Sequence, residues 1–225
     1  MTSAYPKPSL PDEQLAIAWQ CASLLIGYPD EQLLSQAPLL RDASHLLPER
    51  IGAPLRDFVV HLQSTPLTRL ATDYVQTFDH QRRCCLFLTY FAYGDTRKRG
   101  MALLQFKQAY KQAGLVLSAD ELPDHLSVVL EFGATGDRQA AWQLLLQHRA
   151  GLEVLRIALR DSGSAWLPVV EAVTATLPAL RGDEQGAVAR LVAQGPPDEE
   201  VGLAPFAVPE FRPGARAASQ TAGQS

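Results

Sequence analysis

Residues 65–78 read TPLTRLATDYVQTF, and their apolar side chains recur at helical spacing. The positions that form one stripe along such a helix are Leu67, Leu70, Tyr74, Val75 and Phe78. Thr65 suits the N-cap and Pro66 suits the first helical position, so the helix also has a recognisable start. The stretch therefore predicts an amphipathic α-helix that packs one face against a core.

Helical spacing recurs on both sides of this stretch. Residues 12–26 predict an early helix, which Gly27 and Pro29 end. Further apolar stripes occur in residues 103–113, 145–159 and 166–173. Helices are therefore expected to account for most of the chain.

Residues 84–93 are apolar on nearly every side, which predicts a helix in the middle of a bundle. No run of alternating apolar and polar residues is flanked by turn pairs, so no strand is predicted. We expect an all-α, single-domain helical bundle of about seven to nine helices around one core. This domain is predicted over residues 12–194, after a flexible N-terminus at residues 1–11.

The composition changes from residue 195 onward. Residues 195–225 are rich in Pro, Gly, Ala, Ser and Gln and lack helical spacing, which predicts a disordered tail. The scattered apolar residues of this tail are Val201, Leu203, Phe206 and Phe211. We expect them either to dock as a short motif that competes for a binding groove, or to have no role.

Composition and charge disfavour several classes of protein. The formal net charge of the 225 residues is −4, which argues against a nucleic-acid binder such as a helix-turn-helix protein. The three cysteines, Cys21, Cys84 and Cys85, form no spaced disulfide framework, which fits a reducing compartment. No secretion signal or bilayer-length apolar run is found, so we expect a cytoplasmic protein without membrane insertion.

Motifs for catalysis and for cofactor binding are not found either. The sequence has no Gly-rich phosphate loop, no HExxH and no CxxC. Cys84 and Cys85 are adjacent, so on a helix their side chains diverge and serve one tetrahedral metal poorly. We therefore expect no catalytic residue, no metal site and no bound cofactor. A hydrolase that uses a His and an Asp stays an alternative, although no nucleophile has a recognisable setting.

Three pieces of sequence carry a family resemblance. They are YVQTFD at residues 74–79, GDTRKRG at 94–100 and ELPDHL at 121–126. In this order they resemble the NarJ family, the delta subunits of respiratory nitrate reductase, within the wider group of TorD-like redox enzyme maturation proteins. The chain departs from many relatives at residues 89–91, which read TYF where those relatives have a Glu-His pair.

The resemblance implies an assembly chaperone with a TorD-like fold rather than an enzyme. Members of the family bind the N-terminal segment of the nitrate reductase catalytic (alpha) subunit in its apo form. They support insertion of the molybdenum cofactor and assembly of the complex before membrane docking. Molybdenum cofactor delivery proteins are further expected partners. A permanent structural subunit of the reductase is another open interpretation.

The cations of the second piece are predicted at a helix start. With Asp95 as the N-cap, Arg97 and Arg99 lie in the first turn, where cations oppose the helix macrodipole. An anion nearby would offset this placement. That anion is either an acidic client residue or a cofactor phosphate, or else an internal partner such as Asp79 or Asp95.

The third piece is also predicted at a helix start. Pro123 suits the first helical position, so Asp124 and His125 lie in the first turn. The helix dipole stabilises the Asp124 carboxylate and disfavours a protonated His125. The two side chains either meet the client or serve the fold, with Asp124 capping its own helix and His125 packed under the preceding loop.

Residues of these pieces, and of the segment between them, make up the predicted client site. Apolar walls with a polar rim suit an amphipathic peptide, although aromatic side chains at this spacing are often core residues. The predicted client-binding residues are Tyr74, Phe78, Asp79, Arg82, Phe87, Arg97, Arg99, Pro123, Asp124 and His125.

Overall fold

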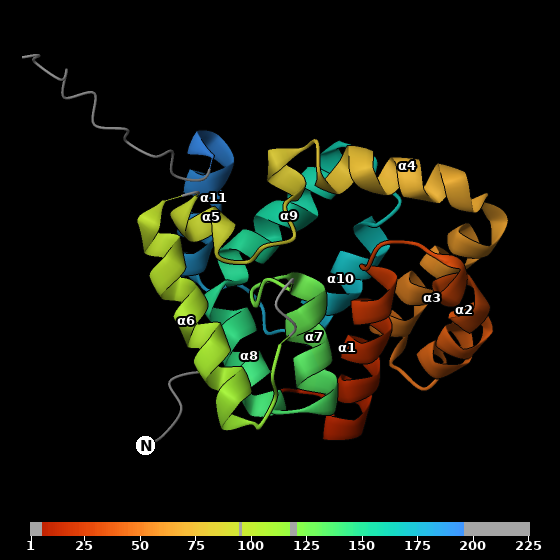
Figure 1. Ribbon diagram of the computed structural model, residues 1–225, viewed down its shortest axis with the longest axis horizontal. Helices are drawn as coiled ribbons and strands as arrows, with labels where there is room; N and C mark the ends of the chain where they lie inside the picture. Colours follow the sequence, from red (N-terminus) through yellow and green to blue (C-terminus); the bar gives the residue numbers. More distant parts are fainter. Residues whose placement is uncertain (1–5, 95, 118–120, 196–225) are drawn as a thin grey trace, which may run out of the picture.

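The computed structural model describes residues 6–94, 96–117 and 121–195. Within these ranges the chain forms eleven α-helices, a short 3-10 helix named η1, and no strand (Figure 1). The bounds are α1 Asp12–Leu25, α2 Glu31–Ser44, α3 Glu49–Ser64, α4 Leu67–Phe78, η1 Arg82–Cys84, α5 Tyr90–Tyr93, α6 Arg97–Gln112, α7 Leu126–Thr135, α8 Arg138–Gln147, α9 Arg149–Asp161, α10 Leu167–Thr176 and α11 Gly182–Gln194. The all-α class is confirmed, with eleven α-helices in these ranges rather than the expected seven to nine. The predicted tail lies, from residue 196 onward, outside the described residues.

α1 is the central helix of the core. It packs against α7 and α10, and α10 also packs against α3 (Figure 1). Trp19 of α1 is fully buried, and its indole N–H donates a hydrogen bond to the Thr176 hydroxyl at 3.1 Å. Gly133 allows α7 to pack directly against α1, because a Cβ at position 133 would overlap the ring of Trp19. The early helix predicted over residues 12–26 is thus confirmed as α1.

α4 confirms the predicted amphipathic helix at residues 65–78. Pro66 is its N-cap rather than its first residue, so the helix begins one position later than predicted. The buried face carries Tyr74 and Phe78, whose rings each lie 5.5 Å from the ring of Trp166. This face is therefore part of the protein core.

Residues 84–93 do not form the central helix that their apolar pattern predicts. η1 ends at Cys84, the chain then runs without a helix as far as Thr89, and α5 adds a single turn. Most of these side chains are nevertheless buried, since α5 packs against α9 and α6 while η1 packs against α9 and α4. The helix prediction is wrong because an apolar pattern without a period does not distinguish a helix from an extended buried segment.

The apolar stripe at residues 145–159 is divided between two helices. α8 ends at Gln147 and α9 begins at Arg149, with His148 as the junction. In the described part of the chain, no helix is both long enough and apolar enough to cross a membrane.

Candidate functional site

Two segments far apart in the sequence meet where the family motifs lie. Phe87 and His125 form an isolated antiparallel bridge. Its flanking backbone hydrogen bonds, both 2.9 Å, run from the Leu88 N–H to the Asp124 carbonyl and from the Leu126 N–H to the Leu86 carbonyl. We call this junction, together with Thr89 and the Arg99 side chain from α6, the crossing site.

The helix start predicted at Pro123 is wrong. Pro123 and Asp124 lie in a turn, which a 3.2 Å hydrogen bond from the His125 N–H to the Leu122 carbonyl closes. α7 begins only at Leu126, and His125 is its N-cap. The turn replaces the predicted first helical turn because the bridge holds His125 in an extended conformation, with φ −65° and ψ 132°.

Asp124 is fully buried and is held mainly by Thr89. Its Oδ2 accepts hydrogen bonds from the Thr89 N–H at 3.2 Å and from the Thr89 hydroxyl. Arg99 completes the group, because its Nε donates to the Thr89 Oγ1 at 3.1 Å and its Nη2 lies 3.6 Å from Oδ2. Thr89 is the N-cap residue of α5, so one carboxylate oxygen ties the turn before α7 to α5 and α6. The second oxygen, Oδ1, has no hydrogen-bond partner among the described residues.

The basic cluster lies in the first turn of α6, as predicted. α6 begins at Arg97 with Thr96 as its N-cap, whereas Asp95 lies outside the described residues. Arg97 is exposed, but the side chain of Arg99 is only 17% exposed and pairs with Asp124. An internal partner for the cluster therefore exists, and it is an acid that the sequence did not single out for this role.

His125 carries a neutral imidazole at pH 7, because burial lowers the pKa of His125 below its usual 6.5 while nearby carboxylates act in the opposite direction. Its Nδ1 accepts a hydrogen bond from the Ser127 N–H at 3.3 Å and lies 2.7 Å from the Ser127 hydroxyl. The centres of the His125 and Phe87 rings lie 5.3 Å apart in a T-shaped arrangement, and the Arg99 guanidinium lies 5.2 Å from the centre of the same Phe87 ring. The His125 side chain thus packs against Phe87, its partner in the bridge, and caps α7.

His148 is a second neutral imidazole near the crossing site. Burial lowers the pKa of His148 to about 4, while the Asp124 charge and a hydrogen bond with the Leu88 backbone act in the opposite direction. The ring lies 5.3 Å from the ring of Phe106 on α6. The junction between α8 and α9 therefore meets the crossing site through an uncharged side chain.

The structure brings only part of the predicted client site together. The predicted residues that meet at the crossing site are Phe87, Arg99, Pro123, Asp124 and His125. Tyr74 and Phe78 lie in the core instead, where the Tyr74 hydroxyl donates to the Ile26 carbonyl at 3.3 Å and burial raises the Tyr74 pKa. The predicted residues with exposed side chains are Asp79, Arg82 and Arg97.

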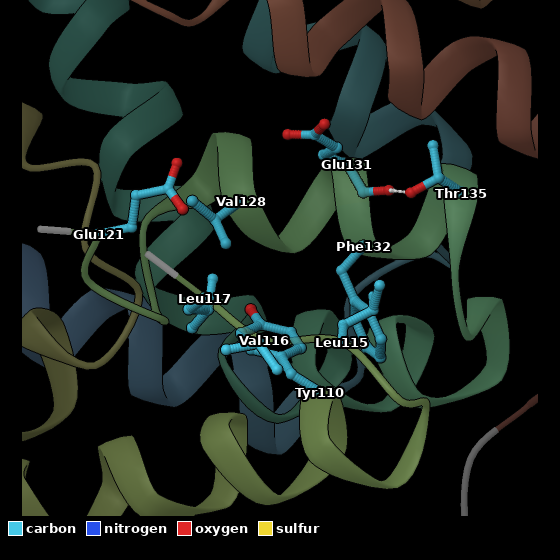
Figure 2. Close-up of a pocket in the computed structure, with 9 residues that line it drawn as sticks. All are labelled: Tyr110, Leu115, Val116, Leu117, Glu121, Val128, Glu131, Phe132 and Thr135. Atoms are coloured by element: carbon cyan, nitrogen blue, oxygen red, sulfur yellow. Dashed lines mark hydrogen bonds between the residues drawn. The ribbon is translucent and has the colours of Figure 1, made fainter. Parts of the chain in front are cut away.

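An open pocket of about 240 Å³ adjoins the crossing site (Figure 2). It lies between α7 and residues 110–117, and we call it the α7 slot. Tyr110 connects the two sites, because its hydroxyl donates to the buried Pro123 carbonyl while its side chain lines the slot. The lining residues are Tyr110, Leu115, Val116, Leu117, Glu121, Val128, Glu131, Phe132 and Thr135.

The α7 slot combines apolar walls with acidic side chains. Figure 2 shows Leu115 and Val116 across from α7, with Glu121 and Glu131 at separate points of the edge. Val116 is 96% exposed, although a large aliphatic side chain gains free energy when it is covered. Both carboxylates are exposed, and neither is paired with a cation in the described part of the chain. The slot therefore fits an apolar segment that also carries a basic group.

The α7 slot was not predicted from the sequence. A signal is present in residues 115–117, which read LVL directly after the helix stop at Gly114, because an apolar run is unusual in a loop. Thr89 was missed for a different reason. It lies 35 residues before Asp124, and no local pattern joins the two positions.

All three motifs lie within the residues that a known family matches. The family model described as the nitrate reductase delta subunit matches residues 44–172. The chain is 38% identical to the nitrate reductase-like protein NarX of Mycobacterium tuberculosis (strain ATCC 25618 / H37Rv) over 71% of its own length, but it spans only 24% of that protein. It is 30% identical to a Bacillus subtilis (strain 168) protein named "Probable nitrate reductase molybdenum cofactor assembly chaperone NarJ", over 76% of this chain and 95% of that one. With the nitrate reductase molybdenum cofactor assembly chaperone NarJ of Escherichia coli (strain K12), the identity is 33% over 49% of this chain and 48% of that one.

One solved structure shares the fold. It is described as a candidate redox enzyme maturation protein from Archaeoglobus fulgidus, and it has a TM-score of 0.53, covering 76% of this chain and 96% of its own. Its identity of 22% makes the likeness informative about the fold alone. The family model covers more than half of this chain, including both segments of the crossing site. The chain therefore belongs to the nitrate reductase delta subunit family.

Proposed function

We propose that this chain is a cytoplasmic assembly chaperone for respiratory nitrate reductase and not a catalyst. In this proposal it binds the N-terminal segment of the apo alpha subunit. It keeps that subunit competent for insertion of the molybdenum cofactor before the complex docks at the membrane. Family membership and the names of the NarJ relatives support the chaperone role. Molybdenum cofactor delivery proteins are additional proposed partners.

The α7 slot is the observation that carries the client proposal. It offers exposed aliphatic side chains and two carboxylates within one open pocket. An amphipathic peptide can cover the aliphatic side chains and place a basic residue beside a carboxylate. The crossing site helps to position the slot, since the hydroxyl of Tyr110, which lines the slot, donates a hydrogen bond to the Pro123 carbonyl.

Chemistry at the crossing site disfavours the hydrolase alternative. His125 lies close to the Ser127 hydroxyl, but this contact belongs to the N-cap of α7. A catalytic triad needs an acid that orients the imidazole, whereas the Asp124 carboxylate binds Thr89. Among the described residues, no group of three His, Cys, Asp or Glu side chains could hold a metal ion.

Calorimetry with synthetic peptides tests the proposal. The wild-type chain is expected to bind a peptide from the N-terminus of a nitrate reductase alpha subunit, with a negative heat-capacity change from apolar burial. Val116→Ser removes about 1 kcal/mol of apolar burial and should weaken that binding about 3- to 10-fold. Val60→Ser on α3 is the matched control, because Val60 is 59% exposed and does not line the slot.

Two results would count against this proposal. A folded wild-type chain that binds no alpha-subunit N-terminal peptide would remove the client assignment. Equal affinities of Val116→Ser and Val60→Ser for the peptide would show that the client binds elsewhere than in the α7 slot.

A further inference from the structure

A second groove, of about 290 Å³, lies between the segment after α4, α9 and α11. It shares no lining residue with the α7 slot, and nothing in the proposed function uses it. Its lining residues are Gln81, Arg83, Val154, Ile157, Ala158, Asp161, Ser162 and Val192. We call it the α9 groove.

The α9 groove has an apolar floor that the described residues leave partly open. Ile157 and Ala158 of α9 and Val192 of α11 pack against the core but keep part of their surface exposed. Val154, which is buried, completes this floor. A segment with two or three aliphatic side chains would cover it.

The place where the chain leaves α11 points to the segment that covers this floor. α11 ends at Gln194, two residues after Val192 of the floor, so the described part of the chain ends beside the groove. Val201 lies six residues beyond Gly195, which limits its reach to about 20 Å. A tether this short holds the segment at an effective concentration on the order of millimolar, so even weak contacts populate a bound state.

Charge supports the same segment. Residues 198–203 read DEEVGL, three acids followed by Val201 and Leu203. Arg82 and Arg83 of η1 are exposed, and neither is paired with a carboxylate in the part of the chain that the structure describes. Asp161 lies on the α9 side of the groove, so the acids are expected on the η1 side.

We propose that residues 198–203 bind in cis in the α9 groove. The acids Asp198–Glu200 pair with Arg82 and Arg83, and Val201 and Leu203 cover the apolar floor. This interaction does not depend on the proposed client, because it uses a different surface and a segment of this chain. It gives the C-terminal residues a docking site separate from the α7 slot, whereas the sequence left open either competition for one binding groove or no role.

Methyl NMR of the full-length chain tests the proposal at a single residue. The sequence has four isoleucines, Ile17, Ile26, Ile51 and Ile157, and only Ile157 lines the α9 groove. In the double variant Val201→Ser, Leu203→Ser, the Ile157 methyl signal should shift, while those of the other three stay unchanged. Phe211→Ser is the matched control and should leave Ile157 unchanged, since it lies beyond the proposed segment.

The ionic contacts are tested by charge reversal in the same full-length chain. Arg83→Glu should shift the Ile157 signal toward its position in the double variant, and adding Asp198→Lys and Glu199→Lys should restore it. If the Ile157 methyl signal has the same position in the double variant as in the wild type, the proposal is overturned. A shift that grows with protein concentration would also overturn it, because the segment would then be binding to a second copy.

Discussion

Glu153 and Asp124 are both buried carboxylates, but only Glu153 uses both of its oxygens. Glu153 on α9 binds Arg149 at 2.8 Å through one oxygen and Arg156 at 2.7 Å through the other. Asp124 uses Oδ2 alone, and its cation, Arg99, lies 3.6 Å away. Oδ1 of Asp124 has no hydrogen-bond partner among the described residues.

The difference follows from where the partners of each acid come from. The partners of Glu153 lie three and four residues away on its own helix, so helical geometry alone places them. Asp124 needs Thr89, which lies 35 residues earlier, and Arg99 from α6. The first cluster stiffens one helix, whereas the second fixes how three segments meet. We infer that the free-energy cost of the unpaired Asp124 oxygen is offset at the crossing site because the carboxylate fixes the position of the turn that borders the α7 slot.

Removing Glu153 should have the largest effect on stability. Glu153→Ala leaves Arg149 buried without its carboxylate, and two guanidinium nitrogens of Arg149 already lack a partner among the described residues. The expected loss in the free energy of unfolding is about 3–5 kcal/mol, measured by chemical denaturation. Glu171→Ala is the control, because its closest partner, Arg160, is half exposed, and it should cost less than about 1 kcal/mol. Equal losses for the two variants would contradict the comparison.

The pH dependence of stability should report His148, the imidazole that senses the Asp124 charge. Its folded pKa of about 4 lies below the unfolded value of 6.5, so the unfolded chain binds this proton first as the pH falls. Stability is then fully present above pH 6.5 and is lost progressively down to about pH 4, by up to about 3 kcal/mol. Burial also lowers the pKa of His125, so it contributes in the same direction.

His148→Gln separates this contribution from the rest. Denaturation of the variant between pH 7 and pH 4 should show a shallower loss of stability than the wild type. His45→Gln, the same replacement at an exposed position, is the matched comparison. An unchanged slope in His148→Gln would show that the imidazole is not held neutral by burial.

A smaller effect is expected when the hydroxyl between Asp124 and Arg99 is removed. Thr89→Val keeps the shape of the side chain but removes the hydroxyl that donates to Asp124 and accepts from the Arg99 Nε. The backbone N–H of residue 89 is then the remaining hydrogen-bond donor to the carboxylate. The expected loss is about 1.5–3 kcal/mol, as for a hydrogen bond to a charged group. Thr72→Val is the control, because its exposed hydroxyl bonds only to the Thr68 carbonyl, and it should stay within about 0.5 kcal/mol of the wild type. If Thr89→Val loses no more free energy of unfolding than the control does, the hydrogen bonds of the Thr89 hydroxyl do not hold the segments of the crossing site together.

Apolar residues that repeat with a helical period predict where α1 and α4 lie, but the stripe of the same kind at residues 145–159 spans two helices, α8 and α9. Both ends of α1 and the start of α4 are predicted within one residue, because each helix carries a stripe and a recognisable boundary. Residues 84–93 are largely buried but show no helical period, and the pairing of residues 86–88 with residues 124–126 depends on a contact between segments far apart in the chain. Propensity and pattern hold no information about that pairing.

The candidate site was predicted in part for the same reason. Asp124, His125 and Arg99 were picked out by their motifs, and the structure does bring them together. Their surroundings differ from the expected helix mouth, because Asp124 faces Thr89 inside the protein. The α7 slot depends on how residues 110–117 lie against α7, which no local pattern encodes.

Photo-crosslinking from position 116 tests whether the α7 slot binds the N-terminal segment of the alpha subunit. A photoreactive amino acid replaces Val116, which is 96% exposed at the α7 slot, and a second chain carries it at Val60 on α3. Each chain is expressed with an apo nitrate reductase alpha subunit, and the crosslinked peptide is identified by mass spectrometry. We expect a crosslink from position 116 to the N-terminal segment of the alpha subunit, and none from position 60. Crosslinks from position 60 alone, or from neither position while nitrate reductase is still activated, would contradict it.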